Sequence, residues 1–204
     1  LDRTLRLNGA VFLMEYDDRQ EEINLPDELS GTGQKTVVAN ASTAEMKGFE
    51  LELQAAPSDN LMIRANLAYL DASYDEFKFD NGRGIQDLSF LEFRRAPEWN
   101  GNIDATYDFE IGGNAAYARI AYQYLGSHFT NFDNSPELKN DAQGLIDASI
   151  GYSVGALQFS LFGRNLADED GYMIGYDVAG LWSYSASRPP RTWGVEVSYD
   201  FGAE

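Results

Sequence analysis

The chain has 204 residues, with 33 acidic and 15 basic side chains, which gives a net charge of −18 at pH 7. This balance argues against nucleic acid as a partner, because phosphate binding requires concentrated Lys and Arg. The sequence contains no cysteine, which excludes disulfides and thiolate metal sites.

Hydropathy does not indicate a membrane helix, because no run approaches the ~18 apolar residues that such a helix needs. The mean hydropathy of −0.39 is that of an ordinary soluble protein. A transmembrane barrel gives the same average, because half of each of its strands is polar. The twelve Tyr, twelve Phe and three Trp residues are enough for aromatic girdles at two membrane interfaces.

Eight long strand candidates follow one another along the chain, and the connections between them alternate in length. We expect the strands at 4–24, 36–56, 61–79, 91–110, 115–131, 141–154, 157–172 and 188–201. The short connections are 57–60, 111–114 and 155–156, and the long ones are 25–35, 80–90, 132–140 and 173–187. This is the plan of an up-and-down outer-membrane barrel with periplasmic turns and extracellular loops. Both ends of the chain are then expected on the periplasmic side.

Strict alternation in the strand at 188–201 predicts one apolar face and one polar face. The side chains assigned to lipid are Trp193, Val195, Val197, Tyr199 and Phe201. The same alternation in the other strands assigns charged residues to the lumen. These are Glu50, Glu52, Arg64, Asp104, Arg119, Asp147, Arg164 and Glu196. The first strand is an exception, because Val11 to Met14 are apolar on both faces.

Strand length separates this pattern from that of a soluble β-sandwich. Strands in globular proteins usually have about five or six residues, whereas several candidates here exceed the ~9–11 residues that cross a bilayer. The predicted fold is therefore all-β: an antiparallel, up-and-down transmembrane β-barrel with about eight strands in residues 1–201 and a short extension at 202–204. The expected location is the outer membrane of a Gram-negative bacterium.

Five short segments, in this order, resemble the carboxy-terminal part of TonB-dependent outer-membrane receptors. They are Asn40-Ala41 with Gly48-Phe49-Glu50-Leu51-Glu52, Leu67 to Ala72, Arg95-Ala96-Pro97-Glu98-Trp99, Gly163 to Asp168, and Pro189 to Thr192 leading to Phe201. The resemblance implies a larger barrel, of about 22 strands, whose lumen holds an amino-terminal plug. It also implies energised uptake of a scarce solute such as a siderophore, cobalamin or a glycan.

The partners that the resemblance implies are outer-membrane lipids, the missing plug and barrel strands, an energy-coupling protein that acts through the plug, the barrel-assembly machinery and a small ligand. The alternative is a complete eight-stranded barrel with a structural or adhesive role. Such a barrel has room only for its own side chains, and surplus carboxylates in a sealed lumen would carry an unpaired-charge cost. The acidic lumen therefore favours part of a larger barrel.

No catalytic, cofactor or metal site is predicted. His128, the one histidine, has Ser127 and Asp133 near it in sequence, which are more typical of loop polar groups than of a catalytic triad. In the long connection 173–187, the aromatic residues Tyr176, Trp182 and Tyr184 are ligand-contact candidates, because aromatic faces stack on sugars or flat chelates. Packing against neighbouring loops or lipid headgroups is the simpler interpretation of the same residues.

Overall fold

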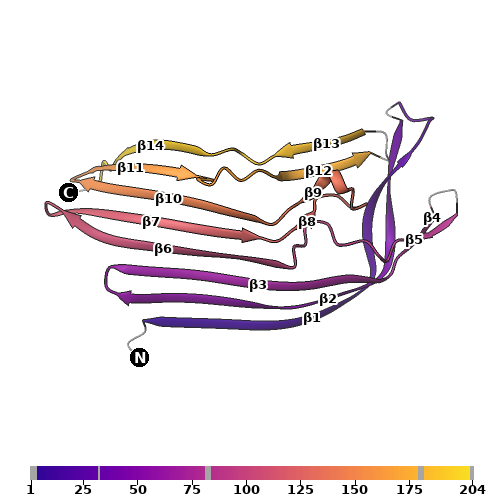
Figure 1. Ribbon diagram of the computed structural model, residues 1–204, viewed down its shortest axis with the longest axis horizontal. Helices are drawn as coiled ribbons and strands as arrows, with labels where there is room; N and C mark the ends of the chain where they lie inside the picture. Colours follow the sequence, from indigo (N-terminus) through magenta and orange to yellow (C-terminus); the bar gives the residue numbers. More distant parts are fainter. Residues whose placement is uncertain (1–3, 32, 81–83, 179–181, 203–204) are drawn as a thin grey trace.

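The computed structural model describes residues 4–31, 33–80, 84–178 and 182–202. Its main element is one eight-stranded sheet in the order β1-β2-β3-β6-β7-β10-β11-β14, with each strand antiparallel to its neighbours (Figure 1). The strands are β1 Leu5–Pro26, β2 Gln34–Ser58, β3 Leu61–Glu76, β6 Trp99–Ile111, β7 Asn114–Leu125, β10 Gln143–Val154, β11 Leu157–Arg164 and β14 Thr192–Tyr199. The predicted up-and-down order is confirmed.

Tight turns join the strands at one end of this sheet. Gly112 and Gly113 in one turn, and Gly155 in another, have positive φ angles of 60°, 78° and 55°, which glycine adopts without a steric cost. Leu5 pairs with Ala55 close to the first tight turn, and Tyr199 pairs with Leu157 close to the last. The start of β1 and the end of β14 therefore lie at the turn end, as predicted.

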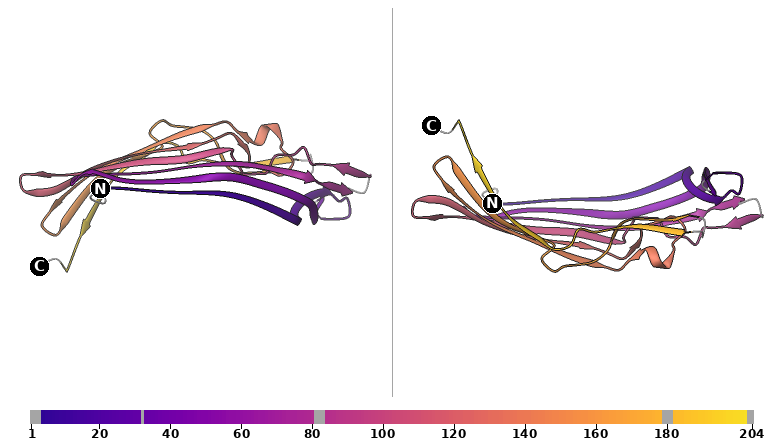
Figure 2. Two further views of the ribbon diagram at one scale, coloured as in Figure 1. Left: turned by 90° about the horizontal axis from the view of Figure 1, so that it is seen from below. Right: turned by 90° about the horizontal axis from the view of Figure 1, so that it is seen from above.

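The sheet stays open in the described part of the chain. β1 and β14 form its two edges and do not pair with each other. Seen from the side, the sheet twists, and β14 splays away from β1 (Figure 2). A complete barrel of eight strands would require these two edges to meet. The structure instead has the form expected for part of a larger barrel.

Several predicted boundaries were wrong at the loop end. The strand expected at 91–110 begins only at Trp99, because Leu91 and Phe93 leave the sheet and enter a buried cluster. The strand expected at 157–172 ends at Arg164, and the one expected at 115–131 ends at Leu125. Short elements occupy the long connections: β4 Lys78–Asp80 with β5 Ile85–Asp87, β8 His128–Phe129 with β9 Lys139–Asn140, and the 3-10 helix η1 Pro136–Leu138.

The connection expected at 173–187 is largely a hairpin of β12 Tyr172–Val178 and β13 Trp182–Ser187. Its ends are held by the segments that resemble receptors. Asn165, with φ of 50°, donates from its side chain to the carbonyls of Glu169 and Pro189. Asp168, with φ of 59°, accepts the backbone N–H of Arg191 at 2.8 Å. These two side chains fasten both legs of the hairpin to the ends of β11 and β14.

The buried core lies at the loop end rather than along the sheet. Its members are Ile23, Ala44, Tyr74, Phe77, Leu91 and Phe93, with Phe77 fully buried. The upper parts of β1 and β2 bend across this end in Figure 1. Asp18 of β1 has a positive φ of 55°, and beyond it Glu21 and Ile23 are buried. The backbone is thus turned so that residues above Asp18 pack into the core.

The pairing of β1 with β2 resolves the exception at Val11 to Met14. Val11 and Leu13 are exposed on the face that also carries Leu51 and Phe49. Phe12 lies opposite Gly48 on the other face, where a Cβ at Gly48 would come within 2.8 Å of the Phe12 ring. The inner face therefore becomes apolar just below the buried core.

Within the described residues, no helix is long and apolar enough to cross a membrane.

Candidate functional site

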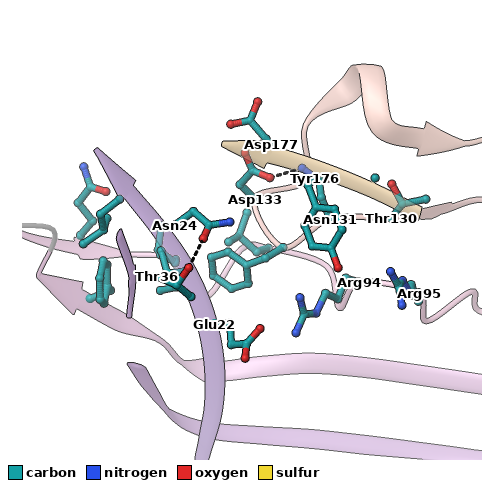
Figure 3. A pocket seen from close by; sticks show the side chains of 18 of the residues that line it. Glu22, Asn24, Thr36, Arg94, Arg95, Thr130, Asn131, Asp133, Tyr176 and Asp177 are labelled. Atoms are coloured by element: carbon teal, nitrogen blue, oxygen red, sulfur yellow. Dashed lines mark hydrogen bonds between the residues drawn. The ribbon is translucent and has the colours of Figure 1, made fainter. Parts of the chain in front are cut away.

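A cavity of about 450 Å³ opens at the loop end. Four parts of the chain form its wall: the upper ends of β1 and β2, the β4–β5 hairpin with the following segment 88–95, the loop 130–133, and β12 at Gly175 to Asp177. Figure 3 shows side chains from these elements converging on the space. A cavity of this size is within the range of small-molecule sites.

Segment 88–95 is held in place by a buried carboxylate on β1. Glu21 is 2% exposed and accepts a hydrogen bond from the Tyr74 hydroxyl at 2.9 Å. The guanidinium groups of Arg19 and Arg94 lie 3.0 and 3.7 Å from its two oxygens, and Arg19 also lies 3.9 Å from the centre of the Phe93 ring. Because a buried charge needs such partners, Glu21 ties the irregular segment to β1 and β3.

The same segment is also fastened to the loop 130–138. The Asn134 side chain accepts the backbone N–H of Glu92 at 2.6 Å and donates to the Glu92 carbonyl at 3.0 Å. The backbone N–H of Arg95 donates to the Phe129 carbonyl at 2.8 Å. The wall that carries Arg94 and Arg95 is therefore built from backbone groups with fixed partners.

Charges of both signs line the cavity. In Figure 3, Arg94 and Arg95 lie together, and Asp133 and Asp177 lie together at another part of the wall. Burial raises the pKa of Asp133 above its ordinary value of 3.8, the Ser135 hydroxyl lowers it, and the negative charges of Asp177 and Glu137 raise it further. A third carboxylate, Glu22 of β1, also lines the cavity, and Arg94 is paired with Glu21, so Arg95 is the arginine of this wall that Glu21 does not bind.

The predicted ligand contacts are only partly together. Tyr176 lines the cavity and pairs across the hairpin with Tyr184, while Val178 pairs with Trp182. Trp182 and Tyr184 are about half exposed and do not belong to the cavity wall. The sequence analysis did not select Arg94 and Arg95, although Arg95 begins one of the segments that resemble receptors. The sequence signal that could have selected these two arginines is their position close to Pro97, in a stretch where apolar and polar residues do not alternate.

The predicted lumen residues share one face of the sheet. Asp104 lies between Arg119 at 3.4 Å and Arg64 at 4.0 Å, so three of them form one ionic group across β3, β6 and β7. Glu52 accepts a hydrogen bond from Asn8, and Asp147 accepts the backbone N–H of Asn165. Arg164 lies over the Phe162 ring, and Glu50 and Glu196 are exposed. Polar side chains therefore cover the lower part of this face.

The opposite face is apolar and exposed. Trp193, Val195, Val197 and Tyr199 pair with Gly163, Leu161, Phe159 and Leu157. Phe201 lies beyond the end of β14, with its ring 4.8 Å from that of Tyr199. Aromatic residues gather at two levels of the sheet. Phe49, Tyr69 and Trp99 form one group of rings in contact, and Tyr107 stacks on Phe109 lower down β6.

The distance between these two aromatic levels along β6 is comparable with the thickness of a membrane. Eight residues separate Trp99 from Tyr107, which corresponds to ~26 Å along a strand at ~3.3 Å per residue. At a tilt of ~40° this becomes ~20 Å of depth, comparable with the ~25 Å apolar band of outer-membrane barrels. Above the upper aromatic group the face becomes charged, with Lys47 at 3.1 Å from Glu45 and 3.4 Å from Asp71.

The surroundings of His128 indicate a structural role and not a catalytic one. It is buried, with Nδ1 2.9 Å from the Gly126 carbonyl and Nε2 3.3 Å from the Asn140 side chain. Asp133 accepts a hydrogen bond from the Ser135 hydroxyl, and the two ring nitrogens of His128 are occupied by the Gly126 carbonyl and the Asn140 side chain. Within the described residues, no three His, Cys, Asp or Glu side chains converge as a metal site.

Comparison with known proteins decides between the two predicted barrels. The model of the TonB dependent receptor-like β-barrel family matches residues 1–166. The chain belongs to this family. Its members are outer-membrane transporters rather than enzymes, and the chain forms part of the carboxy-terminal barrel portion.

Three solved structures show the same fold at low sequence identity. The siderophore receptor PiuA from Acinetobacter baumannii is 21% identical, with a TM-score of 0.73 over 97% of this chain and 26% of its own. The ferric yersiniabactin uptake receptor FyuA from Yersinia pestis is 20% identical, with a TM-score of 0.75 over 98% of this chain and 28% of its own. The copper transporter OprC is 17% identical, with a TM-score of 0.67 over 98% and 29%. The chain thus spans about a quarter of these receptors.

Proposed function

We propose that this chain is the carboxy-terminal third or so of a plugged outer-membrane barrel that imports a scarce metal, bound to an organic chelator or as the ion. The loop-end cavity carries the proposal, because it unites aromatic side chains, two arginines and three carboxylates above a family barrel. The similarity to siderophore receptors and to a copper transporter supports the substrate class. Cobalamin and glycan fragments are alternative substrates, but none of the three solved structures named above is described as a receptor for either.

Each face of the sheet has a role in this proposal. The apolar face from Trp193 to Phe201 contacts lipid, since a barrel wall must be apolar where it meets the bilayer. The polar face with Arg64, Asp104 and Arg119 meets the plug and the water around it. The free edges of β1 and β14 pair with the barrel strands outside this sequence, because unpaired strand edges are not tolerated in a membrane.

Uptake by cells that lack the receptor gene tests the proposal. Cells complemented with the wild-type gene should accumulate radioactive iron from at least one class of ferric chelate, or copper, and should lose this uptake when the energy-coupling protein is removed. Equal uptake of every metal form with and without the gene would contradict the proposal.

A matched pair of arginine variants tests the cavity itself. Arg95→Ala removes an exposed cation from the cavity wall and should weaken binding about tenfold, or ~1.4 kcal/mol. Arg64→Ala removes a cation from the sheet far from the cavity and should leave ligand affinity unchanged. Equal losses in the two variants would mean that the cavity does not bind the imported solute.

A further inference from the structure

The buried carboxylate of Glu21 holds its two guanidinium partners unequally. Its Oε1 atom accepts a hydrogen bond from the Tyr74 hydroxyl at 2.9 Å and lies 3.0 Å from Arg19 Nη2. Its Oε2 atom lies 3.7 Å from Arg94 Nη2, which is beyond the ~3.2 Å limit of an N–H···O hydrogen bond. Glu21 is therefore satisfied mainly by Arg19 and Tyr74, and it holds Arg94 only by a long ionic contact.

Arg19 is fixed beside this carboxylate and does not belong to the cavity wall. Its guanidinium lies 3.9 Å from the centre of the Phe93 ring and 5.7 Å from that of the Tyr74 ring. Aromatic faces attract a cation, so the two rings retain Arg19 next to Glu21. One carboxylate then faces two guanidinium groups, and the surplus positive charge lies on Arg94, which lines the cavity.

A buried oxygen atom also faces Arg94. Asn131 is 4% exposed and lines the same cavity. Its Nδ2 donates to Asp133 and to Ser135, whereas its Oδ1 has no hydrogen-bond partner in the part of the chain that the structure describes. Figure 3 shows this oxygen directed toward Arg94. Because a buried acceptor without a donor costs free energy, the Asn131 oxygen favours a guanidinium turned toward the cavity.

The second arginine of the wall lies beside the first. Figure 3 shows Arg95 next to Arg94. Two of the three carboxylates of the cavity, Asp133 and Asp177, lie together at another part of the wall. An anionic group can therefore contact the two arginines away from that pair of carboxylates.

We propose that Arg94 selects an anionic solute, and that Arg19 keeps Arg94 available by satisfying Glu21. An anionic group in the cavity accepts the N–H donors that Glu21 does not hold, and the Asn131 oxygen accepts another. A planar guanidinium has enough donors for both contacts. This inference rests on the proposed function, because it takes the cavity as the solute site, and it narrows the imported metal to an anionic chelate.

Equilibrium binding of two radioactive iron chelates to the whole receptor in detergent tests the proposal. Ferric tris-catecholate is anionic, and ferric trihydroxamate is uncharged. The wild type should bind the anionic chelate about tenfold more tightly or better, and Arg94→Gln should weaken this binding about tenfold without affecting the uncharged chelate. Arg119→Gln removes an arginine that lies 3.4 Å from Asp104 on the lower sheet. It is the matched control and should leave both affinities unchanged.

Arg19→Gln tests whether availability of Arg94 depends on a residue outside the cavity wall. Without Arg19, Glu21 pairs more closely with Arg94, so affinity for the anionic chelate should fall severalfold. The double change Arg19→Gln and Glu21→Gln also removes the competing carboxylate and should restore affinity close to the wild-type value. A purely structural role of the cluster predicts the reverse, with the double variant at least as impaired as Arg19→Gln alone.

Three outcomes would overturn the inference. The first is equal binding of the two chelates, or binding of neither, by the wild type. The second is wild-type affinity of the Arg94→Gln variant for the anionic chelate. The third is failure of the double variant to recover affinity while its Tm equals that of the wild type. A receptor that imports metal into cells but gives any of these results retains the proposed function. Selective anion binding without uptake would instead contradict the proposed function.

Discussion

The lower strands and the loop end are stabilised in opposite ways. Between the tight turns and the upper aromatic group, the sheet is a single layer whose apolar residues, such as Val195 at 67% exposure, face outward. At the loop end, Phe77, Phe93 and Glu21 are buried among their own neighbours. The lower part therefore depends on lipid outside and on other protein inside, whereas the loop end carries its own small core. A substitution should damage one region without the other.

Phe77→Ala should have the largest effect, and it should be confined to the loop end. Removing a fully buried Phe side chain costs about 3–5 kcal/mol through lost burial and the cavity left behind. Hydrogen exchange in the whole receptor should accelerate in residues 84–96 and remain slow in residues 101–109 of β6. Phe90→Ala, which removes a largely exposed ring, is the control and should change neither region. Equal acceleration of both regions would show that they unfold as one unit.

Val195→Arg tests the lower part of the sheet, which Phe77→Ala should leave unchanged. An Arg on the lipid face costs about 2–4 kcal/mol near the bilayer midplane, because its charge is transferred out of water. The abundance of folded receptor in the outer membrane should fall. Ser198→Arg places the same charge on the opposite face of β14 and should leave abundance close to wild type. Similar losses in both variants would contradict the assignment of the two faces.

Tyr176→Ala separates the cavity from the remainder of the hairpin. Loss of a stacked aromatic is worth about 1–3 kcal/mol, borrowing the magnitude known for bases on aromatic rings. Whole-cell ligand binding should weaken more in this variant than in Trp182→Ala or Tyr184→Ala, because only Tyr176 of the three lines the cavity. Receptor abundance should not change in any of them. A larger loss for Trp182→Ala would place the ligand outside the cavity.

Asp133→Asn should produce the smallest effect, with a sign set by its raised pKa. The folded state favours the protonated carboxyl, so this stabilisation is complete below the ordinary value of 3.8 and is lost as pH rises through the folded-state pKa. The variant should therefore resist thermal unfolding of the loop end slightly better than wild type at neutral pH. The difference should shrink as pH falls and disappear below the ordinary value of 3.8, where Asp133 is protonated in both the folded and the unfolded wild-type protein. A lower midpoint for the variant at neutral pH would contradict this sign.

The sequence by itself determined the strands and their two faces, because alternation with a period of two is a property of each strand alone. The tight turns could be read for the same reason: glycines at 112, 113 and 155 mark positive φ angles locally. The resemblance to the family also rested on local segments. One of them, Gly163 to Asp168, contains the two side chains that fasten the hairpin to the sheet.

Only the tertiary structure decided what happens above the membrane band. Leu91 and Phe93 read as strand residues, but they leave the sheet because Phe77 and Ile23, distant in sequence, offer a buried surface. The hairpin in 172–187 and the meeting of Asp133 with Asp177 were equally invisible, because 44 positions separate those two carboxylates along the chain. Periodicity reports which side of a strand a residue occupies. It carries no information on which loops fold together, and at this end of the protein that packing creates the cavity.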